Sequence, residues 1–328
     1  MKNKLLALLA TIGLVGSASA VKINDNISIN GFIDTSWSSV DTSAANDDND
    51  LDVDEVELNF LVNAGNVSGE LHIDNSEDAN GDNVNFDIEQ VHFTYGFENG
   101  VSIQIGQFGS ALGFEREDPA GLYTFSRAYG DNVYNLGNVD VNVGEGVRLA
   151  YSTDSISAGF AAYNGVGDAE ETSAPLPNGT SDDLNYEFAI TFTGIENLSV
   201  TAGVQGTRVV DPVPAGSTLN DTDITNLHAA YTIDKLLLAA EYVNVDVDAS
   251  DDLSAYLLLA DYDINDKMGI AVRYSEWETG VNADSDQITI APNYSITDSL
   301  GAILEYSSAE NNAGEEEDTL ALELTFTF

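Results

Sequence analysis

The sequence has 328 residues, no cysteine, and 56 acidic against 10 basic residues, which gives a formal charge of −46. The lack of cysteine excludes a disulfide framework and thiol chemistry. The acidic excess excludes nucleic-acid binding, because neutralising phosphates requires a basic surface.

The first twenty residues predict a secretory signal. Lys2 and Lys4 precede an apolar run from Leu5 to Val15, and Ser17-Ala18-Ser19-Ala20 supplies the small residues of a cleavage site. The apolar run is shorter than the roughly 20 residues that a membrane-spanning helix needs. We therefore expect residues 1–20 to be a signal peptide and residues 21–328 to form one domain.

The rest of the chain alternates apolar and polar residues with a period of two, which is typical of β-strands with two different faces. In the segment 320–328, for example, Leu320, Leu322 and Leu324 share one face while Ala321 and Glu323 share the other. Sixteen such segments are predicted, near residues 26–39, 52–63, 66–74, 86–97, 100–109, 145–153, 155–164, 183–193, 198–208, 223–233, 235–246, 252–263, 267–276, 285–296, 299–308 and 317–328.

The connections between these segments distinguish two all-β folds. Periodicity alone fits a soluble sandwich, whose apolar face meets a protein core, and equally a membrane barrel, whose apolar face meets lipid. Here, seven short turns alternate strictly with eight longer polar connections, which places both chain ends on the short-turn side. An even strand number with adjacent ends allows an antiparallel barrel to close without exposed edges. We predict an all-β, transmembrane antiparallel β-barrel.

One predicted strand breaks its own alternation. Phe86 and Ile88 share a parity that Val91, Phe93 and Tyr95 do not. A β-bulge near Glu89-Gln90 would bring both groups to the same face, because a bulge adds one residue to one strand of a pair.

The whole chain resembles the Gram-negative outer-membrane porins, within the β-barrel porin families and of the general sixteen-stranded type. The features that carry the resemblance are the signal peptide, the strand rhythm, the segment GQFGSALGFEREDPAGLYTFSRAY at 106–129 and the ending Leu-Thr-Phe-Thr-Phe. It implies a channel in the cell outer membrane, embedded in outer-membrane lipid and assembled as a homotrimer. An aromatic last residue, here Phe328, looks like the signal that such proteins present to the barrel assembly machinery.

In sixteen-stranded porins the third long loop folds into the barrel and narrows it. The corresponding connection here, roughly 110–144, is the longest of the chain, and long structureless loops are often functional. The alternative is a solvated outer loop with no part in permeation. The resemblance implies that the pore constriction is formed by the charged residues of this loop, which are Glu115, Arg116, Glu117, Asp118, Arg127 and Asp131.

The lumen face of the predicted strands carries charge of both signs. Arg148 and Arg273 have lumen parity, and an arginine that faced lipid would be energetically costly. The excess of acid predicts a preference for cations, as rings of acidic side chains do in other channels. The lumen-lining acids predicted by parity are Asp34, Glu55, Glu57, Glu70, Asp74, Glu187, Glu241, Glu305 and Glu323.

The segment DANGDNVNFD, residues 78–87, is a candidate calcium site. Asp78, Asn80, Asp82 and Asp87 offer oxygen ligands around Gly81, which suits a hard cation. The alternative is that these residues only form a polar turn, in which Asp, Asn and Gly are common. Calcium is the one cofactor that the sequence suggests.

The sequence favours transport over catalysis. His72, His92 and His228 are its imidazoles, and none lies in a recognisable catalytic motif. The leading hypothesis is passive diffusion of small hydrophilic solutes and ions, with a cation preference. One alternative is a substrate-selective channel in which the arginines Arg116, Arg127, Arg148 and Arg273 handle anionic solutes such as phosphate or carboxylates. Another is a structural or adhesive surface barrel.

Overall fold

The computed structural model describes residues 20–43, 48–77, 83–115, 118–129, 144–164, 184–208, 221–248, 252–278 and 284–328. For residues 48, 76–77 and 83–85 it describes the backbone alone. Within the described residues, no helix has the length and apolar character needed to cross a membrane.

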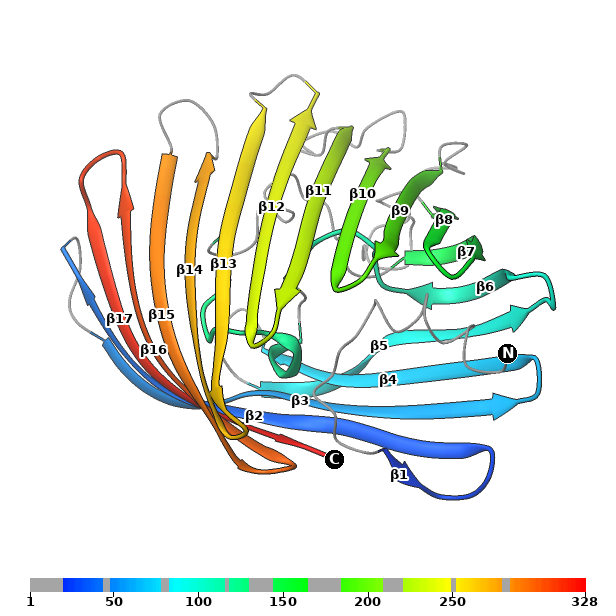
Figure 1. Ribbon diagram of the computed structural model, residues 1–328, viewed down its shortest axis with the longest axis horizontal. Helices are drawn as coiled ribbons and strands as arrows, with labels where there is room; N and C mark the ends of the chain where they lie inside the picture. The colour runs from blue at the N-terminus through cyan, green and yellow to red at the C-terminus, as the bar shows by residue number, and fades with distance from the viewer. Residues whose placement is uncertain are drawn as a thin grey trace.

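The described chain is almost entirely antiparallel strand (Figure 1). Each strand from β2 to β17 pairs with the next, and β17 pairs with β2, so sixteen strands form a closed barrel. The strands are β1 (Val21–Lys22), β2 (Ile27–Thr42), β3 (Asp48–Ala64), β4 (Val67–Glu77), β5 (Asn83–Gly96), β6 (Val101–Phe108), β7 (Gly144–Ser152), β8 (Ile156–Tyr163), β9 (Asn185–Ile195), β10 (Leu198–Thr207), β11 (Thr222–Ile233), β12 (Leu236–Val247), β13 (Leu253–Asn265), β14 (Met268–Glu278), β15 (Asp284–Thr297), β16 (Leu300–Asn311) and β17 (Glu316–Thr327).

The sixteen predicted strands are confirmed, with ends that differ by a few residues. The two-residue strand β1, which pairs with the start of β2, was not predicted. The tight turns use residues that tolerate a positive φ, namely Gly65 at 74°, Asn197 at 63° and Asp234 at 56°. The last residue also joins the wall, because Phe328 and Gly31 exchange two backbone hydrogen bonds of 3.1 Å.

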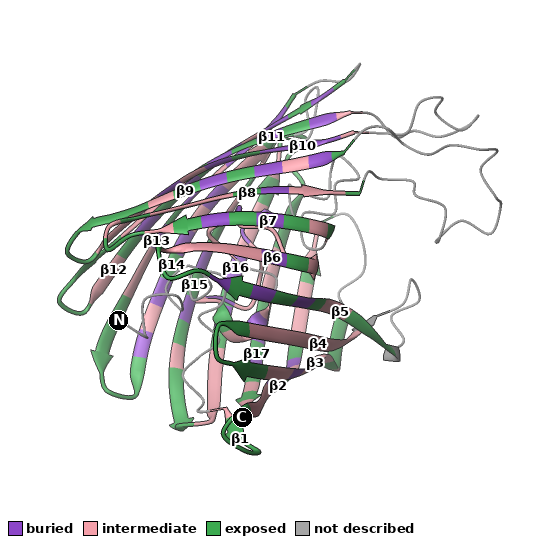
Figure 2. Cartoon of the chain, turned by 90° about the vertical axis from the view of Figure 1, so that its right-hand side faces the viewer, coloured by how far each residue is buried: buried purple, intermediate pink, exposed green. Residues whose placement is uncertain are grey.

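The predicted two-faced pattern is confirmed along the strands, where exposed and buried residues alternate (Figure 2). On β17, Leu320, Leu322 and Leu324 are 37–42% exposed on the outside, whereas Ala321 and Glu323 are buried on the inside. An apolar outside is what a barrel needs in order to face lipid.

Bulges on β3 and β5, the two strands that flank β4, adjust the alternation of faces. On β5, Gln90 pairs with His72 and Ile88 pairs with Ile73, so Glu89 is an extra residue, as the sequence predicts. The second bulge, on β3, was not predicted: Glu55 pairs with Asp34 and Asp52 with Ser36, which leaves Val53 and Asp54 opposite one residue of β2. Both bulges bring additional acidic side chains to the inner face.

Candidate functional site

The described part of the connection after β6 lies inside the ring of strands and contains the short 3₁₀ turn η2, Pro119–Gly121 (Figure 1). We call residues 109–129 the inner loop, of which 109–115 and 118–129 are described. Its backbone and side chains bond to inward-facing residues of β9, β12, β14 and β16, as the following contacts show. The segment thus occupies the position that the porin resemblance implies for the third long loop.

An apolar patch on the inner wall receives one side of the inner loop. Leu112 and Tyr129 of the loop are buried in a cluster with wall residues, and Phe114 and Tyr123 pack against it with their rings stacked 6.3 Å apart. The wall residues from β12 and β13 are Ala239, Val243, Val245, Val247, Leu253, Ala255, Leu257 and Leu259. Burying these apolar surfaces against each other removes them from the water of the lumen, which favours the docked loop.

The apolar patch was not predicted, although the sequence contains a signal for it. The strand segments LLLAAEYVNVDV and LSAYLLLADYDIN carry apolar residues at both parities, unlike most strands of the chain. An inner face that is apolar in a barrel needs a cover, and the inner loop provides it. The predicted strands have an apolar face toward lipid and a polar face toward the lumen, and this prediction is wrong for the inner faces of β12 and β13.

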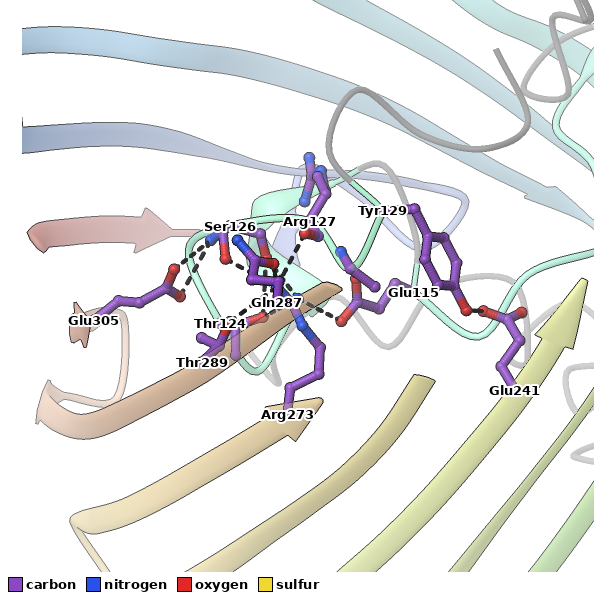
Figure 3. A network of polar contacts seen from close by, with 11 residues as sticks. Glu115, Thr124, Ser126, Arg127, Tyr129, Glu241, Arg273, Gln287, Thr289 and Glu305 are labelled. Atoms are coloured by element: carbon purple, nitrogen blue, oxygen red, sulfur yellow. Dashed lines mark hydrogen bonds and ion pairs between the residues drawn. The ribbon is translucent and has the colours of Figure 1, made fainter. Parts of the chain in front are cut away.

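Arg273 on β14 binds the inner loop through its guanidinium group (Figure 3). Its side chain is completely buried, and one guanidinium nitrogen lies 2.8 Å from a carboxylate oxygen of Glu115. The other hydrogen-bond acceptors are Thr124 Oγ1 at 2.7 Å, Ser126 O at 2.7 Å, Ser126 Oγ at 2.8 Å, Arg127 O at 2.9 Å, Gln287 Oε1 at 2.9 Å and Thr289 Oγ1 at 3.3 Å. A buried guanidinium is tolerated only with such a set of acceptors, so the loop and the arginine require each other.

Three buried acids of the wall bind donors of the inner loop. Glu187 on β9 accepts hydrogen bonds from Ser110 Oγ and the Ala111 N–H. Glu241 on β12 accepts hydrogen bonds from the Phe114 N–H at 2.7 Å and the Tyr129 hydroxyl at 3.0 Å. Glu305 on β16 accepts a hydrogen bond of 3.2 Å from the N–H of Ser126 (Figure 3). Charge-assisted hydrogen bonds of this kind are about twice as strong as neutral ones.

Arg148 on β7 secures the start of the inner loop. It donates to Glu187 at 3.1 Å and to the Gly109 carbonyl at 2.7 Å, and it lies over the Phe108 ring, 4.4 Å from the centroid. Arg148 and Arg273 therefore face inward, as their parity predicts, but neither is open to the lumen, with exposures of 7% and 0%.

The same holds for the acids predicted to line the lumen. Glu187, Glu241, Glu305 and Glu323 face inward but are at most 4% exposed. For the first three the reason is the inner loop, which covers them and uses their carboxylates. Sequence parity gives the face of a residue correctly and does not reveal what lies on top of it.

A second group of acids lines β3, β4 and β5 on the other part of the inner wall. Glu55, Glu70, Asp74 and Glu89 are partly exposed there, and Glu57 is buried. His72 lies among them, with Nδ1 3.0 Å from Glu57 and Nε2 3.3 Å from Glu70. Of these residues, Glu89 and His72 were not predicted as site residues, although the expected bulge at Glu89-Gln90 already pointed to an irregular position.

The inner loop meets this acidic wall at Asp118. One carboxylate oxygen from each of Glu55, Glu57 and Asp118 lies within 4.8 Å of the others. Arg127 interacts electrostatically with Asp34, Glu55 and Glu323. Asp118 and Arg127 are thus brought close to acids of the inner wall, whereas Glu115 pairs with Arg273. That these residues form the constriction stays a prediction.

The remaining predicted site residues are in segments that the structure leaves undescribed. Arg116, Glu117 and Asp131 of the loop, and Asp78, Asn80 and Asp82 of the suggested calcium site, lie outside the described residues. Asp87 is exposed on β5 and pairs with Asp74 of β4. The calcium site at 78–87 stays a prediction.

Comparison with known proteins identifies one family and many similar folds. Residues 16–328 match the model of the family described as "Putative beta-barrel porin-2, OmpL-like", whereas no curated protein matches. One similar structure is the outer membrane channel DcaP of Acinetobacter baumannii, 13% identical, with a TM-score of 0.67 over 95% of this chain and all of that one.

Two further structures show the same fold. The anion-selective porin from Comamonas acidovorans is 14% identical, with a TM-score of 0.68 over 92% of this chain and 99% of that one. The trimer form of OmpT, an outer membrane protein of Vibrio cholerae, is 13% identical, with a TM-score of 0.64 over 93% of this chain and all of that one.

Replacing Arg273 by alanine should release the inner loop. Its partner Glu115 would remain buried without a counter-charge, and breaking a buried ion pair on one side costs about 3–5 kcal/mol. We expect trypsin to cleave the folded barrel after Arg127 at least about tenfold faster, because a cost of this size far exceeds the 1.4 kcal/mol that corresponds to a factor of ten. The measurement is limited proteolysis in detergent, followed by mass spectrometry.

The matched control is Arg208→Ala, which removes a partly exposed arginine that pairs with Asp223 outside the inner loop. That variant should be cleaved after Arg127 at the wild-type rate. Equal rates for wild type and Arg273→Ala would mean that Arg273 does not hold the loop.

Proposed function

This chain belongs to the OmpL-like beta-barrel porin-2 family and is an outer-membrane channel, and we propose that small hydrophilic solutes and ions cross it by passive diffusion, with a preference for cations. The inner loop narrows the lumen, and the partly exposed acids Glu55, Glu70, Asp74 and Glu89 of β3, β4 and β5 lie beside the remaining space. Transport of this kind needs no energy source and no catalytic group.

The observation that supports the cation preference is the unequal exposure of the inner charges. Arg148 and Arg273 are buried and paired with Glu187 and Glu115, so their charge is largely cancelled. By contrast, four acids of the β3–β5 wall, Glu55, Glu70, Asp74 and Glu89, keep part of their surface open. Excess acid along a water-filled path attracts cations and repels anions.

The anion-selective alternative depends on open arginines. One protein of the same fold, from Comamonas acidovorans, is an anion-selective porin, so the fold itself accommodates that preference. Of the four arginines on which the alternative depends, the two on the wall, Arg148 and Arg273, are bound to the inner loop or to Glu187, which argues against it.

Neutralising two open acids of the wall should weaken the cation preference. Glu70 on β4 and Glu89 on β5 have side chains 28% and 20% exposed, so Glu70→Gln with Glu89→Gln removes charge from the path without removing loop contacts. We expect the potassium-to-chloride permeability ratio, obtained from the zero-current potential in a planar bilayer, to exceed 1 and to fall toward 1 in this variant. The effect should shrink in 1 M salt, where the Debye length is about 3 Å instead of the roughly 10 Å in 0.1 M salt.

The matched control is Glu310→Gln with Glu315→Gln, which removes two acids near the hairpin that joins β16 and β17. This control should keep the wild-type permeability ratio. Anion preference of the wild type would contradict the proposal and favour the arginine-based alternative, and a wild-type barrel without conductance would favour a structural or adhesive role.

We further propose that the barrel assembles as a homotrimer and enters the membrane through recognition of its last strand, which ends at Phe328. The trimer form of OmpT, which has the same fold, supports the first part. Native mass spectrometry of the detergent-solubilised protein should give three times the mass of one chain. The mass of a single chain would contradict the trimer.

A further inference from the structure

We propose that a calcium ion bound by Glu55, Glu57 and Asp118 ties the inner loop to strand β3. This site is distinct from the segment 78–87 that the sequence suggested. It is also independent of the ion preference proposed above, because binding to the protein in detergent is measured without any current.

The spacing of the three carboxylates fits one ion. One oxygen from each group lies within 4.8 Å of the other two. Calcium binds oxygen ligands at about 2.3–2.6 Å, so oxygens that share an ion can be up to about 5 Å apart. Two ligands come from the wall and the third from the inner loop, so a bound ion would join the two elements.

Glu57 is the feature that points most directly to a ligand. The residue is only 1% exposed, and within the described part of the chain neither of its carboxylate oxygens accepts a hydrogen bond. The Nδ1 atom of His72 lies 3.0 Å from Oε1 and pairs with it when the imidazole is protonated, whereas Oε2 has no partner among the described residues. A buried carboxylate without donors is costly, and most buried polar groups in proteins have a partner.

Other buried acids of the barrel show what is missing at Glu57. Glu187, Glu241 and Glu305 are equally buried, and each accepts hydrogen bonds from the inner loop. Glu57 faces the loop at Asp118, which is another acid and brings a second negative charge. A cation bound between the two carboxylates would attract both of them and so offset their mutual repulsion.

The local charges leave room for a divalent ion. Glu55, Glu57 and Asp118 carry three negative charges, and Glu89 adds a fourth near His72. Arg127 interacts electrostatically with Glu55, which offsets part of this charge. A set made only of carboxylate oxygens favours calcium or magnesium over softer metals.

A neighbouring set of ligands makes a different prediction. Glu57, His72 and Glu89 also place ligand atoms within 4.8 Å of one another. Because this set includes an imidazole nitrogen, it would suit zinc instead. We favour the set of Glu55, Glu57 and Asp118, because all its ligand atoms are carboxylate oxygens. This set also explains why the inner loop places an acid, Asp118, against an acidic wall.

The test is equilibrium dialysis of the folded barrel in detergent against radioactive calcium, after treatment with a chelator and in about 0.15 M potassium chloride to screen weak surface binding. Asp118→Asn and Glu57→Gln should each weaken one calcium site by about tenfold or more, since each removes a charged ligand from a small set. His72→Gln and the double variant Asp78→Asn with Asp82→Asn should keep that site. The mobility of unheated samples in gels reports whether each variant has folded.

The proposal is overturned if the wild type binds no calcium at millimolar concentration, or if Asp118→Asn binds it as the wild type does. Loss of the site in the Asp78→Asn, Asp82→Asn variant alone would place calcium at 78–87 instead. Binding of zinc but not calcium, abolished by His72→Gln, would assign the metal to the neighbouring set. If Glu57→Gln fails to fold, Asp118→Asn, which changes only the inner loop, still decides the question.

Discussion

The burial of Arg273 is the interaction on which the interior of this barrel depends. A guanidinium without water must find its acceptors within the protein, and here most of them belong to the inner loop rather than to the wall. The loop in turn covers the apolar faces of β12 and β13, which would otherwise meet the lumen water. Each half of the arrangement therefore removes the energetic penalty of the other.

This docking divides the inner wall into two parts with different roles. One part comprises inward-facing side chains of β7, β9, β12, β14 and β16, which bind the inner loop or support the residues that bind it. On β3, β4 and β5, Glu55, Glu70, Asp74 and Glu89 are left partly open to the lumen. In the proposed channel, the residues that hold the inner loop are thus separate from those that would select among ions, although both sets have the same parity in the sequence.

Local patterns made the strands, their alternation and the β5 bulge predictable, because lipid outside and water inside impose a period of two on every strand. The β3 bulge was not predicted, although the sequence contains the same signal, because Leu51 and Val53 share a parity that Val56, Leu58 and Phe60 do not. The burial of Arg148 and Arg273 could not be predicted for another reason. Their ion-pair partners, Glu187 and Glu115, lie 39 and 158 positions away in the chain, beyond the reach of any local pattern.

The central claim is that the inner loop lies against the barrel wall, and a disulfide tests it most directly in a chain that has no cysteine of its own. A Cβ atom on Gly203 of β10 would lie 2.2 Å from Leu112 Cδ2 of the loop, so cysteines at these two positions can meet. Leu112→Cys combined with Gly203→Cys should form a disulfide on oxidation of the folded barrel, seen as a mass loss of two hydrogens and a linked pair of tryptic peptides. A folded double variant whose thiols both remain free after oxidation would contradict the docked loop.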